Sequence, residues 1–187
     1  MTTFEPPPVI VRWVRGLEET TALDRPVRVL EPHVTKLFGS GARGAVLRGD
    51  WLGHALHPTL TDLALGSWTS ASVLDVVGRG RWPEAAQALV GTGLVFVGPT
   101  AWSGWAEWST AGPKEKRVGF VHAVSNGVAI GLYAASWIAR RRGHPDSGAR
   151  LSLLGAAVAG AGAYLGGHLA AARHVSTHHP AFDVHPG

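Results

Sequence analysis

Residues 118–139 read VGFVHAVSNGVAIGLYAASWIA, a run of 22 residues without a formal charge that is followed directly by Arg140, Arg141 and Arg142. As an α-helix this run is about 33 Å long, which is enough to cross a hydrocarbon core of about 30 Å. It also contains His122 and Asn126, which are four positions apart and so share one side of the helix. The run predicts a membrane-spanning helix that carries one polar pair.

Three further stretches have the length of a span, namely residues 56–77, 85–106 and 151–172. The second and third carry no formal charge, whereas Asp62 and Asp75 make the first the weakest of the four. Spans that alternate in direction pair most simply in even numbers. The sequence therefore predicts an all-α protein, with an integral membrane four-helix up-down bundle at residues 51–173. Asp62 is expected to face its interior, because a charge at the bilayer centre costs about 2.5 to 3.5 kcal/mol.

The bundle is flanked by an N-terminal amphipathic extension, residues 1–50, and by a histidine-rich tail, residues 174–187. Asp24 and Pro26 predict the start of a helix in the extension. Its apolar spacing fits a helix on the membrane surface and equally a small helix packed on the spans. At the end of the second span, Trp102, Trp105 and Trp108 indicate an aromatic belt at the lipid headgroups.

Small residues recur every four positions on the last two predicted spans, and such stripes let membrane helices approach closely. We expect these stripes to form the contact between the two helices. They comprise Ala123, Gly127, Gly131 and Ala135 on one helix, and Gly155, Ala159, Ala163 and Gly167 with the pair Gly162 and Gly166 on the other.

Composition excludes several kinds of site. Cysteine is absent, so this chain forms no disulfide, offers no thiolate metal ligand and ligates no iron–sulfur cluster. The net charge is +4, but the first 50 residues hold seven Lys and Arg against six Asp and Glu, which argues against a nucleic-acid surface. The start of the chain lacks a basic segment followed by an apolar one, so no cleaved signal peptide is expected.

Threading the four spans up and down places most of the ten histidines at or just outside one end, among them His57, His122 and His168 within the spans and His54 at their edge, and only His144 at the other end. A b-type haem takes two imidazoles from facing helices, and His122 and His168 lie at matched depth, with His57 as a competing ligand. A non-haem metal would instead take His57, Asp62, His122 and His168. A hydrogen-bonded cluster that locks the helices is the third interpretation, and the sequence leaves all three open.

The runs LGHALHPTLTDLALGSWTSASVLD, VGFVHAVSNGVAIGLYAASWIARRRG and GAYLGGHLA resemble the bacterial membrane family known as domain of unknown function 2231. The resemblance covers about residues 51–173. In that family the four-helix unit is often fused at its C-terminal end to a Rieske iron–sulfur domain. The resemblance implies a redox-associated membrane module, with His57, His122 and His168 at the family's histidine positions.

The sequence thus favours a multi-pass protein of the bacterial inner membrane that binds haem b or serves a Rieske-type or other redox partner. An electron-transfer or accessory subunit is favoured over a stand-alone enzyme. Two alternatives stay open: a non-catalytic membrane anchor or assembly module, and a metal-dependent membrane protein that uses His and Asp ligands.

Basic residues predict cytoplasmic termini. The end of the bundle that carries both termini has 11 Lys and Arg in all against six at the other end, although counting only those near a span gives six against six. Alkaline phosphatase fused after Gly187 should therefore be inactive in cells, because the enzyme requires export. Strong phosphatase activity would place the C-terminus outside and reverse the assignment.

Overall fold

The computed structural model describes residues 6–182, which form helices and short turns and no β-strand. The predicted all-α class is confirmed. The seven α-helices are α1 (Val9–Glu19), α2 (Asp24–Val34), α3 (Gly41–Arg48), α4 (Leu56–Gly78), α5 (Pro83–Thr110), α6 (Pro113–Arg141) and α7 (Pro145–Arg173).

Helices α4 to α7 coincide with the four stretches predicted from apolar length. The last three each begin at a proline, whose fixed φ suits the first helical position and whose missing N–H has no partner to lose there. Charged residues continue these helices beyond the uncharged runs. Among the described helices, α5, α6 and α7 are long and apolar enough to cross a membrane, and α4 does not reach that threshold.

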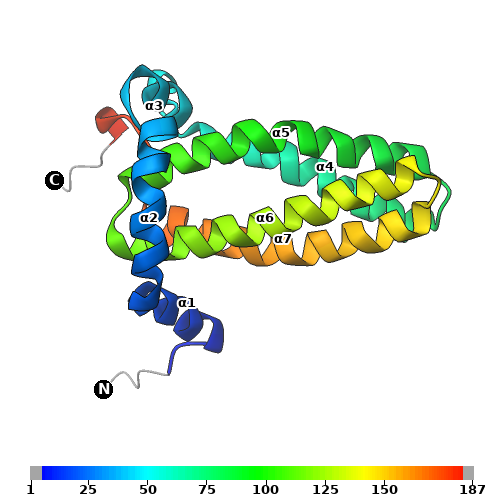
Figure 1. Ribbon diagram of the computed structural model, residues 1–187, viewed down its shortest axis with the longest axis horizontal. Helices are drawn as coiled ribbons and strands as arrows, with labels where there is room; N and C mark the ends of the chain where they lie inside the picture. Colours follow the sequence, from blue (N-terminus) through cyan, green and yellow to red (C-terminus); the bar gives the residue numbers. More distant parts are fainter. Residues whose placement is uncertain (1–5, 183–187) are drawn as a thin grey trace.

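The four long helices form two antiparallel hairpins, α4 with α5 and α6 with α7 (Figure 1). The hairpins converge where their own loops lie, at residues 79–82 and 142–144, which we call the far end. The ribbons of the two hairpins diverge toward the opposite end, across which α2 runs (Figure 1). We call this the histidine end, because His57, His122 and His168 lie in its half of the long helices.

A stacked aromatic pair joins the hairpins near the middle of their length. The rings of Trp68 and Tyr133 lie 4.0 Å apart between centroids, and both side chains are buried. Trp68 also donates its indole N–H to the carbonyl of Val90 on α5, at 3.2 Å. One cluster therefore holds α4, α5 and α6 together, with Ala156 of α7 packed against it.

The N-terminal extension packs on the histidine end of the long helices. Val27 and Val34 of α2 are buried against Trp108, which is only 5% exposed and donates its indole N–H to the carbonyl of Lys116. The aromatic belt predicted around Trp108 is therefore wrong for that residue, which belongs to the core beneath α2. Trp102, at 51% exposed, retains the outward position that a belt requires.

Charge pairing fixes the extension to the beginning of α6. Arg117 binds Asp24 at 2.6 Å, and Lys116 binds Glu31 at 2.6 Å. The Arg117 guanidinium also donates to the backbone carbonyl of Glu18, at 2.6 Å. The extension thus places acidic groups next to the basic residues in the first turns of α6.

The prediction that the small-residue stripes form the contact between α6 and α7 is only partly correct. Gly127 and Gly131 of α6 and Ala163 and Gly167 of α7 are exposed, so they do not form the contact between these helices. The contact instead uses Gly155, Gly162 and Gly166 of α7, and a Cβ at each would touch a side chain of α6: Tyr133, Asn126 and His122, respectively.

This contact predicts that replacing glycine by leucine lowers the stability of the protein at some positions of α6 and α7 and not at others. Gly155→Leu and Gly162→Leu should each destabilise the protein by about 1 to 3 kcal/mol, because a Cβ would lie 3.1 Å from the Tyr133 ring or 2.5 Å from the Asn126 amide oxygen. Gly131→Leu and Gly160→Leu are matched controls with open space around the new Cβ. Thermal unfolding in detergent measures the difference. Equal melting temperatures for all four variants would contradict this assignment of the interface.

Candidate functional site

His57 lies in the first turn of α4 and is bonded to the neighbouring helix α5. Its Nδ1 donates to the backbone carbonyl of Thr100 at 2.9 Å. A carbonyl oxygen can only accept, so Nδ1 carries the proton and Nε2 keeps its lone pair. The nearest polar group to Nε2 is the Thr61 hydroxyl, at 3.5 Å, which is a long and weak contact. Gly104 leaves room for the ring, since a Cβ there would lie 2.8 Å from it.

His122 has the same arrangement on the other hairpin. Its Nδ1 donates to the carbonyl of Gly162 on α7 at 2.7 Å, which again leaves the lone pair on Nε2. That nitrogen accepts a hydrogen bond from the Asn126 amide at 2.9 Å. A Cβ at Gly166 would lie 2.9 Å from the ring, so glycine also makes space for this imidazole.

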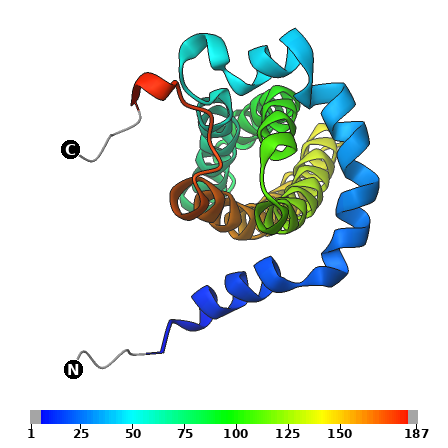
Figure 2. The ribbon, with the colours of Figure 1, turned by 90° about the vertical axis from the view of Figure 1, so that its left-hand side faces the viewer.

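The two histidines belong to α4 and α6, the diagonal pair among the four long helices (Figure 2). Each ring is held through Nδ1 by a carbonyl of the partner helix in its own hairpin, so in both rings Nε2 carries the lone pair, which at His122 is bonded to Asn126. Nε2 is the nitrogen with which histidine most often binds a metal when Nδ1 is hydrogen-bonded to a carbonyl.

His168 is directed to α1 instead. Its Nε2 lies 2.7 Å from a carboxylate oxygen of Glu18, which is 2% exposed and also accepts two hydrogen bonds from the Arg173 guanidinium. Those hydrogen bonds from Arg173 hold the pKa of Glu18 below its usual value, against the opposing effect of burial. Sequence reasoning missed Glu18, because nothing near it in the chain indicates that α1 folds back onto α7.

Asp62 does not face the interior, as was expected, but is exposed on the outer side of α4. Five residues after His57 on a helix, it is turned by about 140° from that ring. Within residues 6–182, no group of three or more His, Asp or Glu side chains is arranged to hold a metal ion. The assignment of His57, Asp62, His122 and His168 as ligands stays a prediction.

The start of the predicted tail covers the histidine end. Thr177 donates its backbone N–H and its hydroxyl to the buried carboxylate of Glu107, the latter at 3.0 Å. Further along, His54 pairs with His178 through a backbone bridge, and its ring stacks on Phe182. Residues 174–182 are therefore bound to the long helices, while residues 183–187, with His185, lie outside the described part of the chain.

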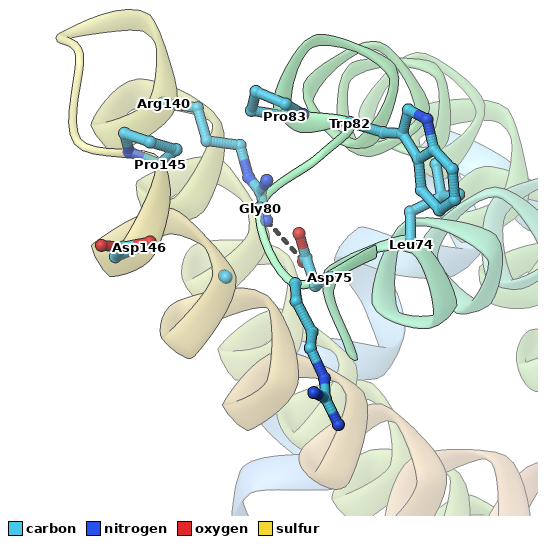
Figure 3. A pocket seen from close by; sticks show the side chains of 10 residues that line it. Leu74, Asp75, Gly80, Trp82, Pro83, Arg140, Pro145 and Asp146 are labelled. Carbon is cyan, nitrogen blue, oxygen red and sulfur yellow. Dashed lines mark hydrogen bonds and ion pairs between the residues drawn. The ribbon is translucent and has the colours of Figure 1, made fainter. Parts of the chain in front are cut away.

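The far end holds a cavity of about 170 Å³ beside a buried ion pair (Figure 3). Arg140 of α6 binds Asp75 of α4 at 2.6 Å, and their side chains are 2% and 6% exposed. Arg140 also contacts the hydroxyl of Ser136, which donates to the carbonyl of Gly148 on α7. The sequence did contain a signal for this ion pair, because Asp75 and Arg140 carry opposite charges and each lies just before a far-end loop. The pairing was nevertheless not predicted.

Comparison with known proteins gives one match. The model of the family described as "Predicted membrane protein (DUF2231)" matches residues 53–179. Among curated proteins and solved structures, none matches the chain significantly. The match begins after α3, so α1 and α2 lie outside it.

The carboxylate of Glu18 predicts a pH-dependent attachment of α1. Its pKa is lowered in the folded protein, so the stability it contributes is present above its unfolded value of about 4.5 and is lost as pH falls through the folded value. Glu18→Gln should weaken the attachment by about 1.5 to 3 kcal/mol, the usual contribution of a hydrogen bond to a charged group. Hydrogen exchange of the α1 amides, followed from pH 7 downward, measures both effects.

Glu19→Gln is the matched control, because its side chain is 65% exposed and pairs with Lys114 at the surface. It should leave the exchange of α1 nearly unchanged. A wild-type α1 that stays protected at acid pH, or equal effects of the two substitutions, would contradict the role given to Glu18.

Proposed function

We propose that this chain, which belongs to the DUF2231 family of predicted membrane proteins, is a multi-pass redox subunit that binds haem b between His57 and His122. In this proposal α4 joins α5, α6 and α7 as a fourth span. Its polar side chains face the other helices at His57 and Asp75, which compensates for its lower apolar character.

The observation that carries the proposal is the shared geometry of the two histidines. Both rings donate Nδ1–H to a backbone carbonyl, both keep the lone pair on Nε2, and both are accommodated by a glycine on the neighbouring helix. A bis-histidine haem requires this tautomer on each side of the iron, and haem supplies one-electron transfer when bound.

One residue of this chain would have to adjust. The Asn126 amide must turn away from Nε2 of His122, which a rotation of its side chain permits. His168 is the alternative second ligand, but it would first have to leave Glu18. The pairing of His57 with His122 breaks no buried ion pair and is therefore the one we propose.

The remaining parts of the proposal concern location and partner. We place the protein in the bacterial inner membrane with both termini in the cytoplasm, so that the histidine end opens to that side. A separate Rieske-type or other redox protein would exchange electrons there, since this chain has no cysteine to ligate an iron–sulfur cluster.

A second candidate is a non-catalytic membrane anchor whose histidines lock the helices together. The bond from the Asn126 amide to Nε2 of His122 favours it, because that bond completes the hydrogen bonding of the ring without any ligand.

Absorption spectroscopy separates the two candidates. Protein produced with an ample haem supply should purify with a Soret band, and His57→Ala and His122→Ala should each abolish most of it, because each removes one axial ligand. His168→Ala is the matched control and should keep the band. If the wild-type protein is colourless, the haem proposal fails and the membrane anchor remains. If His168→Ala loses the band while His57→Ala retains it, the proposed ligand pair is wrong.

A further inference from the structure

The first half of α1 exposes an apolar surface that the rest of the chain does not cover. Val9, Ile10 and Trp13 are 60%, 49% and 73% exposed. At helical spacing the three side chains share one side of α1, while Arg12 and Arg15 project from the other. A side chain as large as Trp13 is seldom left in water without a partner.

The second half of α1 is firmly attached, which fixes the direction of the first half. Val14 is buried in a cluster with Val118 of α6 and Leu165 of α7, and Glu18 binds Arg173. Two views show the result: α1 crosses the long helices at a steep angle at the histidine end, and its beginning extends past α7 (Figures 1 and 2). A helix at a steep angle to membrane spans lies close to the plane of the membrane.

The surface beside α7 at this level is occupied by lipid, since α7 is one of the candidate spans of a membrane protein. Val14 packs on Leu165 and Leu169 of α7, so α1 lies directly beside this helix. Arg12 and Arg15 border the apolar side as cations, as is typical of helices that lie among anionic headgroups. Both the composition of α1 and its position therefore indicate that lipid covers its apolar side.

We infer that α1 is an interfacial membrane helix, with Val9, Ile10 and Trp13 inserted at the boundary between headgroups and acyl chains beside α7 and with Arg12 and Arg15 bound to lipid phosphates. The inference rests on the membrane location of α5 to α7 and is independent of haem. It gives the extension a function as a second attachment to the leaflet at the histidine end.

The absence of cysteine allows a direct test, because a single introduced cysteine is the only site for a thiol label. Three variants carry an environment-sensitive fluorophore: Val9→Cys on the apolar side of α1, Arg15→Cys as the matched control on its charged side, and Leu154→Cys as a reference on α7, where the side chain is 59% exposed. Each protein is placed in nanodiscs that contain anionic lipid with brominated acyl chains, and quenching by the lipid is compared with quenching by iodide in water.

The label at position 9 should resemble the label at position 154, with strong quenching by brominated lipid, weak quenching by iodide and a blue-shifted emission. The label at position 15 should show the reverse. Replacing anionic by zwitterionic lipid should reduce the lipid quenching at position 9 and leave that at position 154 unchanged.

Two results would overturn the inference while leaving the membrane location intact. One is iodide quenching at position 9 as strong as at position 15, and the other is protection of position 9 from both quenchers, which indicates a protein partner or a second copy of the chain. If the label at position 154 also escapes the brominated lipid, the membrane location itself fails, and the inference fails with it.

Discussion

Polar bonds between helices determine how this protein is assembled. Lipid tails are as apolar as the side chains that face them, so burial gives membrane helices little reason to associate. Within each hairpin, a histidine ring donates to a carbonyl of the partner helix, from His57 to Thr100 and from His122 to Gly162. Between the hairpins, Asp75 binds Arg140 in a buried ion pair. The rotation of each helix about its axis follows from which side carries these groups.

That dependence explains what sequence could predict. Charge-free length located α5 to α7 to within several residues, because the cost of charge in lipid acts on each segment separately, and α4 was added as the partner that completes an even number. Length alone could not predict which side of α6 faces the other helices. Residues four apart drift by about 40° per step, so Ala123 and Ala135 cannot lie on one side of a straight helix. The buried side alternates steps of four and three, through Ala129, Tyr133, Ser136 and Arg140.

For the three candidate histidines, the sequence predicted the position along the helices and not the direction of the rings. His57, His122 and His168 do lie toward one end, as the up-down threading required. Their depth along the helices was available from the sequence, whereas the direction of each ring was not. His168 is turned to a carboxylate 150 positions earlier in the chain, and no local pattern reports a contact of that range. The outward position of Asp62 could not be predicted for the same reason, since it follows from the direction of the His57 ring on the same helix.

The link between Glu18 and Arg173 also constrains how the protein is made. The two residues are 155 positions apart, and Arg173 closes the last long helix. At about 5 to 20 residues per second, the ribosome needs roughly 8 to 30 s to synthesise that interval. During this time α1 has been released but its acceptor does not exist, so Glu18 remains hydrated and unpaired. Closure of α1 onto α7 is therefore a late event of biogenesis, which can occur only after the final span has been inserted.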